Sequence, residues 1–184
     1  MAVQKILLYP DEESALRKKS EPVPAVNRRV RKLIRDLKDT LGDHPEAIGL
    51  AAAQINVHFR VVLVHLGIRD ASQESSGEVL VMVNPEILEA GDEKHDFDGC
   101  LSFPGLYGET VRPHYLRVAG IDEKGESFDR IFEGFDAVVV HHEIDHLDGL
   151  LFIDHIEKLE DLYRLTLDES GEPIRVPVTT GLGQ

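Results

Sequence analysis

The stretch EGFDAVVVHHEIDHLDGLLF, residues 133–152, sets the architecture of this chain. Its apolar residues recur at the spacing of one helical face, and they are Phe135, Val138 and Val139. Gly149 is typical of a residue that ends a helix. One more turn of the same face reaches His142 and His146, so both imidazoles should point toward the interior with the apolar side chains.

Two histidines four residues apart can bind a zinc-like or iron-like ion from one side. Glu143 follows His142 directly and lies about 100° further round the helix. It is therefore near the ion without being forced to bind it, which suits a carboxylate that takes a proton from metal-bound water. The alternative is a histidine-rich structural helix, because a chain with nine histidines can contain H-E-x-x-H by chance.

A third ligand decides between these readings. The extended protease pattern needs a histidine where this chain has Phe152, and His155 comes three residues too late, which disfavours that class. Cys100 is the remaining candidate, in the segment DGCLSFPG bounded by Gly99 and Pro104. Its alternative role is that of a buried inert cysteine. Two histidines, one thiolate and an open fourth position describe a catalytic metal site.

Composition limits the remaining function classes. The 184 residues suit one domain, and the single cysteine rules out an internal disulfide. A net charge of −14 disfavours direct nucleic acid binding as the main activity, although docking on a larger nucleic-acid machine through a local patch stays open. The first residues do not fit a signal peptide, and no segment reaches the length of a membrane span. We expect a cytoplasmic protein without membrane contact.

The order of elements predicts an α+β fold with mostly antiparallel β-sheets packed around the metal-binding helix that carries HEIDH. We expect a helix over 28–42, a strand over 59–66, a loop over 68–78, and a strand over 79–83 that ends at Asn84-Pro85. Residues 115–122 and 127–133 should form a hairpin that turns at Gly125. We expect a single catalytic domain over 1–184, with residues from about 160 to 184 as a divergent tail.

Three motifs in order carry a resemblance to a known family. GLAAAQ (49–54), GCLS (99–102) and HEIDH (142–146) resemble the three signature motifs of peptide deformylase, and the resemblance extends through most of residues 3–156. It implies a metal-dependent hydrolase that removes the N-formyl group from the N-terminal formylmethionine of newly synthesised proteins. Its partners would be N-formylmethionyl peptides and nascent chains. The alternatives are a family member that binds metal with little or no turnover, acting as a binding protein, and a zinc peptidase, which GCLS opposes.

The resemblance also implies a role for each matching residue. The metal ligands would be Cys100, His142 and His146. The ion would be Fe²⁺ in first place, with Zn²⁺, Ni²⁺ or Co²⁺ as alternatives. Glu143 would be the general base and then the acid, while the side chain of Gln54 and the backbone N–H of Leu101 would stabilise the oxyanion. Gly49 and Gly99 would pair with an extended peptide, and the methionine pocket would be lined by Ile48, Phe135, Val138 and Val139.

The sequence departs from the family pattern at three motif positions. Ala47 and Asp98 stand where glycine and glutamate are usual, and His141 stands where glutamine is usual. We expect Asp98 to pair with Arg112 beneath the metal loop, and we expect His141 to face away from the metal. The acidic, proline-interrupted tail disfavours ribosome docking through a basic C-terminal helix, which many bacterial members have.

Overall fold

The sheet follows one antiparallel path, β1-β2-β3-β4-β6-β7, with β5 also paired to β4. The computed structural model describes residues 2–67, 79–168 and 170–179. Its strands are β1 (Gly49–Ala51), β2 (Val61–His65), β3 (Val79–Gly99), β4 (Leu106–Ile121), β5 (Ser127–Glu133), β6 (Leu162–Leu167) and β7 (Pro173–Pro177). Its helices are α1 (Glu13–Leu16), α2 (Arg28–Gly42) and α3 (Phe135–Asp148), with 3-10 turns η1 (Ala52–Ile55), η2 (Phe152–His155) and η3 (Leu159–Asp161). The α+β class with mostly antiparallel pairing is confirmed.

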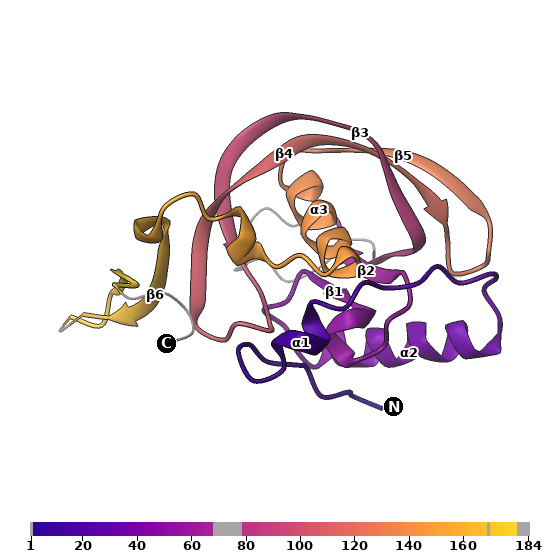
Figure 1. Ribbon diagram of the computed structural model, residues 1–184, viewed down its shortest axis with the longest axis horizontal. Helices are drawn as coiled ribbons and strands as arrows, with labels where there is room; N and C mark the ends of the chain where they lie inside the picture. Colours follow the sequence, from indigo (N-terminus) through magenta and orange to yellow (C-terminus); the bar gives the residue numbers. More distant parts are fainter. Residues whose placement is uncertain (1, 68–78, 169, 180–184) are drawn as a thin grey trace.

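Strand β2 lies between the two long helices, and its alternating side chains serve both of them. Val61 and Leu63 belong to the apolar cluster that contains the buried face of α2. Val62 and Val64 belong to the cluster that contains the buried face of α3. Successive side chains of a strand point to opposite faces, so β2 is buried on both sides. Figure 1 shows α2 beneath β1 and β2, and α3 above them under the arch of β3, β4 and β5.

Helix α2 has the bounds that its apolar spacing predicts. Asn27 caps it, because its side-chain oxygen accepts hydrogen bonds from the backbone N–H groups of Arg29 and Val30 at 2.9 and 3.1 Å. One stripe of the helix is buried against the sheet, and it consists of Val30, Leu33, Ile34, Leu37, Thr40 and Leu41. The opposite stripe is polar and exposed.

Strand β3 does not end at Asn84-Pro85, so that prediction is wrong. The strand continues to Gly99, with one register shift against β4 across this segment, between Val83 and Glu86, and a second after it, between Ile87 and Glu89. Asn84 takes a positive φ of 51°, and its side-chain amide bonds both backbone groups of Val23, at 2.8 and 2.9 Å. Proline is tolerated in a strand where the ladder is interrupted, which explains how the chain passes this point without ending the strand. The loop expected over 68–78 lies outside the described residues.

The predicted β4–β5 hairpin is confirmed, with Gly125 at a φ of 92° in its turn. Helix α3 is also confirmed, from Phe135 to Asp148. Gly149 follows it with a φ of 75°, and an added Cβ there would overlap the backbone of Arg17. Glycine therefore both ends the metal helix and permits close contact with the N-terminal segment.

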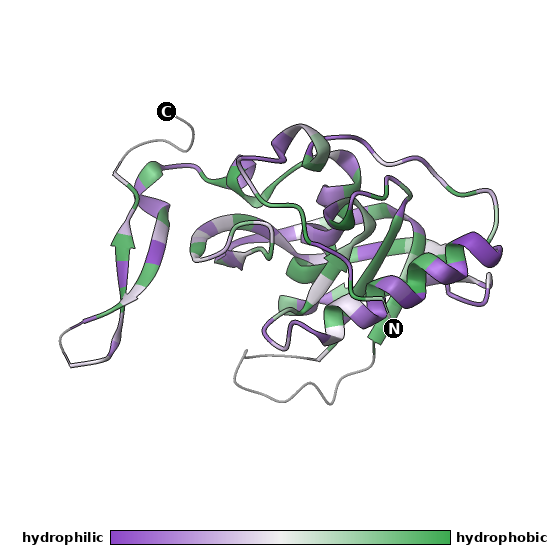
Figure 2. Cartoon of the chain, turned by 90° about the horizontal axis from the view of Figure 1, so that it is seen from below, coloured by the Kyte–Doolittle hydropathy of each residue, from purple (hydrophilic) through white to green (hydrophobic). Residues whose placement is uncertain are grey.

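The C-terminal segment forms a two-stranded ribbon of β6 and β7 and no long helix, in agreement with the proline-interrupted sequence of the tail. Strand β6 pairs with β4 at Leu106–Gly108, a few residues after Cys100. Figure 2 shows the ribbon projecting from the body of the protein. Among the described residues, no helix has both the length and the apolar character that crossing a membrane requires.

Candidate metal centre

Cys100, His142 and His146 come together from two elements. Cys100 follows the last residue of β3, and both histidines project from α3. One ligand atom from each of the three lies within 4.8 Å of the others, and Cys100 Sγ is 3.3 Å from His146 Nε2. The helical spacing of the two histidines places both on one face of α3, as the sequence predicts, and this face meets the loop after β3.

Asp98 fixes the orientation of His142. Its Oδ1 accepts a hydrogen bond from His142 Nδ1 at 2.7 Å, inside the protein where both side chains are buried. This bond turns Nε2 of the imidazole toward the cluster, which is how a carboxylate commonly orients a metal-binding histidine. The end of β3 thus supports the site twice, because Asp98 lies behind His142 and Cys100, a candidate ligand, follows the last residue of the strand.

The thiol of Cys100 is set up to ionise. Burial alone raises its pKa, but the charge of His146 and hydrogen bonds with His142 and His146 outweigh burial and lower the pKa to about 5. A thiolate is the form that binds a metal ion. This chemistry separates Cys100 from an inert buried cysteine.

Glu143 is buried beside the two histidines with one carboxylate oxygen, Oε2, lacking a hydrogen-bond partner among the described residues. Burial raises its pKa to about 7, although the positive charge of His142 and His146 acts in the opposite direction. A carboxylate whose pKa lies near neutrality can both accept and return a proton at physiological pH. An added Cβ at Gly49 would overlap this carboxylate, so the glycine leaves the room that Glu143 occupies.

Gln54 brings a neutral hydrogen-bond donor to the same place. Its Oε1 accepts from the backbone N–H of Ala51 at 2.9 Å, which fixes the amide so that Nε2 faces Cys100 Sγ at 3.4 Å and Ser102 Oγ at 3.3 Å. The side chain is 2% exposed. The side chain of Gln54 therefore lies next to Cys100 and the adjacent Leu101, although Gln54 is far from them in the sequence.

The donor set fits a divalent transition metal. One sulfur and two imidazole nitrogens suit iron, zinc, nickel or cobalt, and three protein ligands are typical of a catalytic rather than a structural site. Nδ1 of His146 and Oε2 of Glu143 are buried polar atoms left without partners inside the described structure. A bound ion or water would explain the unpartnered oxygen of Glu143, whereas Nδ1 of His146 is not the nitrogen that faces Cys100.

A second cluster of similar residues lies beside the first. It consists of His141, Asp145 and His155, and their ligand atoms also lie within 4.8 Å of one another. The guanidinium of Arg112, which is 0% exposed, lies among them. Its Nη1 is 2.6 Å from Asp145 Oδ2 and 2.7 Å from His141 Nδ1. His155 Nε2 contacts the same oxygen of Asp145 at 2.8 Å.

A family model described as polypeptide deformylase matches residues 3–161. The chain belongs to the peptide deformylase family. Members of this family are metallo-hydrolases, in agreement with the cluster of Cys100, His142 and His146. The match ends before β6, so the ribbon of β6 and β7 lies beyond the part that the family model describes.

Relatives and solved structures agree with this assignment. The chain is 42% identical over 161 residues to peptide deformylase 1 of Ralstonia nicotianae, covering 87% of this chain and 90% of that protein. A crystal structure of a peptide deformylase from Legionella pneumophila superposes with a TM-score of 0.75 at 39% identity, covering 86% of this chain and 88% of that one. A class I type b peptide deformylase from Acinetobacter baumannii with Met-Ala-Ser bound superposes at 0.75 with 30% identity, covering 84% and 99%.

Most residues that the resemblance assigns to the substrate lie around this centre. Ile48, Phe135 and Val139 share the apolar cluster of α3, with Ile48 and Phe135 partly buried at its margin. Val138 is 3% exposed but is not part of that cluster. Gly49 opens β1, and Gly99 closes β3 against Tyr107, whose ring an added Cβ at Gly99 would meet at 2.8 Å.

The structure shows how the chain accommodates the three residues that depart from the deformylase pattern. Ala47 is not among the non-glycine residues with positive φ in the described chain, so alanine is unstrained there. The predicted pairing of Asp98 with Arg112 is confirmed, at 2.7 Å between Oδ2 and Nε. The shorter acid thus reaches both Arg112 and His142. His141 faces Arg112 and not the metal ligands, as expected.

Sequence reasoning missed the part that Asp145 and His155 take in this arrangement. Asp145 stands four residues after His141, so helical spacing could have placed the two together. His155 comes after the break at Gly149, in η2, and no periodicity connects it to α3.

Proposed function

We propose that this protein hydrolyses the N-formyl group of the N-terminal formylmethionine of newly synthesised chains and releases formate. The observation that carries the proposal is the position of Glu143, a buried carboxylate with a pKa of about 7 beside the ligand atoms of Cys100, His142 and His146. The family supplies the reaction class, because its members are peptide deformylases.

One divalent ion per chain would be held by Cys100, His142 and His146, with Fe²⁺ as the first candidate and Zn²⁺, Ni²⁺ or Co²⁺ accepted by the same donors. When bound, the ion is a Lewis acid that lowers the pKa of water and makes hydroxide available at neutral pH. Asp98 would keep His142 in the tautomer that leaves Nε2 free to bind.

Glu143 would accept the proton of the attacking water and then donate it to the nitrogen of the leaving amine. Its pKa near 7 suits both steps, because neither protonation state is strongly favoured at neutral pH. The Nε2–H of Gln54 and the backbone N–H of Leu101 would donate to the formyl oxygen as negative charge develops on it. Removing one donor of this kind typically costs about 10²–10³ in rate.

The substrate would bind as an extended strand along Gly49 and Gly99, where backbone pairing reads little sequence beyond the first side chain. That first side chain, methionine, would contact Ile48, Phe135, Val138 and Val139. The clustering of Ile48, Phe135 and Val139 beside α3 supports this pocket, whereas Val138 rests on the resemblance alone.

The same proposal gives the location and partners. N-formylmethionyl peptides and nascent chains are made in the cytoplasm of bacteria, so we place the protein there. The ribbon of β6 and β7 replaces the basic C-terminal helix, so contact with the ribosome through that helix has no support in this chain.

Formate release from formyl-Met-Ala-Ser by protein purified anaerobically and loaded with Fe²⁺ tests the proposal. We expect release that depends on the ion, and no cleavage of unblocked Met-Ala-Ser. Cleavage of the unblocked peptide would identify a peptidase. Full metal occupancy without formate release would identify a binding protein.

A further inference from the structure

Helix α2 concentrates positive charge in an acidic chain. It contains six of the 20 lysine and arginine residues but only two acidic residues, whereas the whole chain has a net charge of −14. Five of these cations recur every three or four residues on the stripe opposite the buried one, and all five are exposed: Arg28, Arg31, Lys32, Arg35 and Lys38. They extend over roughly 15 Å of the helix axis.

The positions of these cations do not stabilise helix α2. Its first turn contains Arg28, Arg29 and Arg31 and no acidic residue, and its last turn contains no basic residue. The positive end of the helix dipole is the N-terminus, so this order of charges opposes helix stability. Arg28 with Lys32, and Arg31 with Arg35, are also like charges four residues apart, which repel.

Some of these cations have no acidic partner within the described chain and are available to bind another molecule. Lys32 pairs with Asp36 at 2.5 Å, and Lys38 pairs with Glu123 at 2.6 Å. Arg28, Arg31 and Arg35 make no ion pair with any described residue. Arginine presents a planar fork of donors that matches phosphate oxygens, so free arginines on one stripe suit a phosphate-bearing partner.

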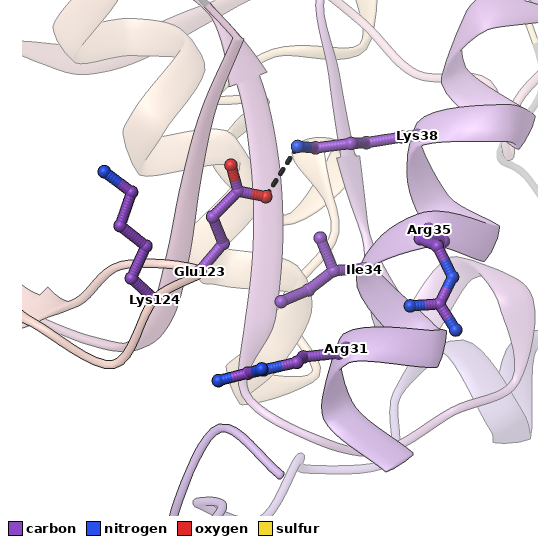
Figure 3. Close-up of a pocket in the computed structure, with 6 residues that line it drawn as sticks. All are labelled: Arg31, Ile34, Arg35, Lys38, Glu123 and Lys124. Carbon is purple, nitrogen blue, oxygen red and sulfur yellow. Dashed lines mark hydrogen bonds and ion pairs between the residues drawn. The ribbon is translucent and has the colours of Figure 1, made fainter. Parts of the chain in front are cut away.

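The surface is hollowed along this stripe. Arg31, Ile34, Arg35 and Lys38 line one side of a depression of about 360 Å³, and Glu123 and Lys124 on the β4–β5 turn line the other. Figure 3 shows these side chains on two facing elements, with Lys38 reaching Glu123 across the gap. Because cations line two sides of this depression, its shape suits a projecting row of phosphates, such as a nucleic acid backbone, better than the flat surface of a bilayer.

This surface lies away from the metal centre. Strands β1 and β2 separate α2 from α3, because the two helices pack on opposite faces of β2. A partner on α2 would therefore lie on the other side of β1 and β2 from α3, the helix that carries His142 and Glu143 (Figure 1).

We propose that the α2 basic face, defined as Arg28, Arg31, Lys32, Arg35, Lys38 and Lys124, binds the phosphate backbone of folded RNA. The choice of RNA over another polyanion rests on the proposed function, because the substrate is made by an RNA-containing machine. A bilayer is disfavoured, because the apolar stripe of α2 is buried and cannot insert. The net charge of the chain opposes binding weakly, since charges beyond about 8 Å are screened at physiological salt.

Fluorescence anisotropy with a labelled RNA hairpin tests this surface. We expect a Kd in the range of about 10⁻⁴ to 10⁻⁶ M, weakening steeply with salt, as backbone contacts do. The triple variant Arg28→Ala, Arg31→Ala, Arg35→Ala should bind at least tenfold more weakly, with the salt slope reduced by about three. The matched control removes three exposed cations elsewhere, through Lys18→Ala, Lys158→Ala and Arg164→Ala, and should bind within about twofold of the unmodified protein.

Two further readouts separate docking from structure and from catalysis. The triple variant should keep full formate release from formyl-Met-Ala-Ser and a thermal midpoint at least as high as before, because the removed charges oppose the helix dipole. Glu143→Gln should bind RNA normally, so loss of deformylation and loss of RNA binding can be told apart.

Three results would overturn the proposal: no RNA binding at low salt, an equal loss in the control variant, or equal affinity for phosphatidylglycerol vesicles at matched phosphate.

Discussion

Two clusters of potential metal ligands lie side by side around α3, and we propose that only one of them binds a metal ion. Cys100, His142 and His146 form the first, and His141, Asp145 and His155 form the second. In both clusters the potential ligand atoms lie within 4.8 Å of one another. They differ in their neighbours, because the second cluster surrounds the buried guanidinium of Arg112, whose positive charge already balances the carboxylate of Asp145.

We describe the second cluster as saturated because the carboxylate of Asp145 already pairs with Arg112, His141 and His155, although Nη2 of Arg112 has no partner among the described residues. Burial raises the pKa of Asp145, but hydrogen bonds from His141 and His155 and the charge of Arg112 hold it far below its usual range. A dication placed among these atoms would lie beside the guanidinium, where like charges 4 Å apart repel by about 4 kcal/mol per unit charge at a typical effective dielectric. The first cluster has no guanidinium among its ligand atoms, and Nδ1 of its His146 lacks a partner in the described chain, as does Oε2 of the neighbouring Glu143.

The two clusters are nevertheless connected. Arg112 reaches Asp98 with Nε and Asp145 with Nη1, and the other oxygen of Asp98 holds His142. Thr110 donates a further hydrogen bond to Asp98 at 3.0 Å. We infer that the saturated cluster supports Asp98 and so positions His142, a candidate ligand of the other cluster.

The largest expected effect falls on Glu143. Replacing it in Glu143→Gln removes the proton acceptor but leaves Cys100, His142 and His146 unchanged. We expect kcat for formate release to fall by about 10²–10⁴, with metal content unaffected. Activity within tenfold of the original, measured at equal metal occupancy, would remove Glu143 from the role of base.

Metal stoichiometry tests the comparison directly. The protein should bind one equivalent of Co²⁺ or Zn²⁺, and Cys100→Ser should bind it far more weakly, because a neutral hydroxyl is a poor ligand beside two imidazoles. His141→Gln is the matched control in the other cluster and should still bind one equivalent with the same affinity. A second equivalent that disappears in His141→Gln would mean that both clusters bind metal.

Arg112→Ala should affect both clusters. It leaves Asp98 and Asp145 buried without their cation, so we expect a loss of about 3–5 kcal/mol in the free energy of unfolding. It also frees Asp98 behind His142, so turnover and metal affinity should each fall by about ten- to a hundredfold. Arg112→Lys restores charge but not the fork and should recover part of both. Normal kinetics and metal content in folded Arg112→Ala protein would disconnect the clusters.

How far the sequence predicts this arrangement depends on how the residues are spaced. Helical periodicity places His142, Glu143 and His146, and it also predicts the exact bounds of α2. It cannot place Cys100 beside them, because that contact depends on the path of the loop after β3. Cys100 was predicted as the remaining candidate for a third ligand, and the motif resemblance gave it the same role. The continuation of β3 through Asn84-Pro85 was missed because a register shift is a property of two paired strands.

Replacement of His155 should have the smallest effect, and it gives the most stringent test of the difference between the two clusters. Its side chain is 24% exposed, and it gives Asp145 one hydrogen bond at 2.8 Å while Arg112 gives a shorter one. His155→Leu should therefore lower the free energy of unfolding by about 1 kcal/mol, the usual net value of one such bond. Since Arg112 still holds Asp98, metal affinity and kcat should stay within about twofold, and His155→Gln should recover most of the lost stability because its amide can donate to the same oxygen. Denaturant titration and metal binding measured on the same preparations separate the two readouts. A drop in metal affinity without a drop in stability would show that His155 acts on the metal centre itself, and the division between an open and a saturated cluster would then be wrong.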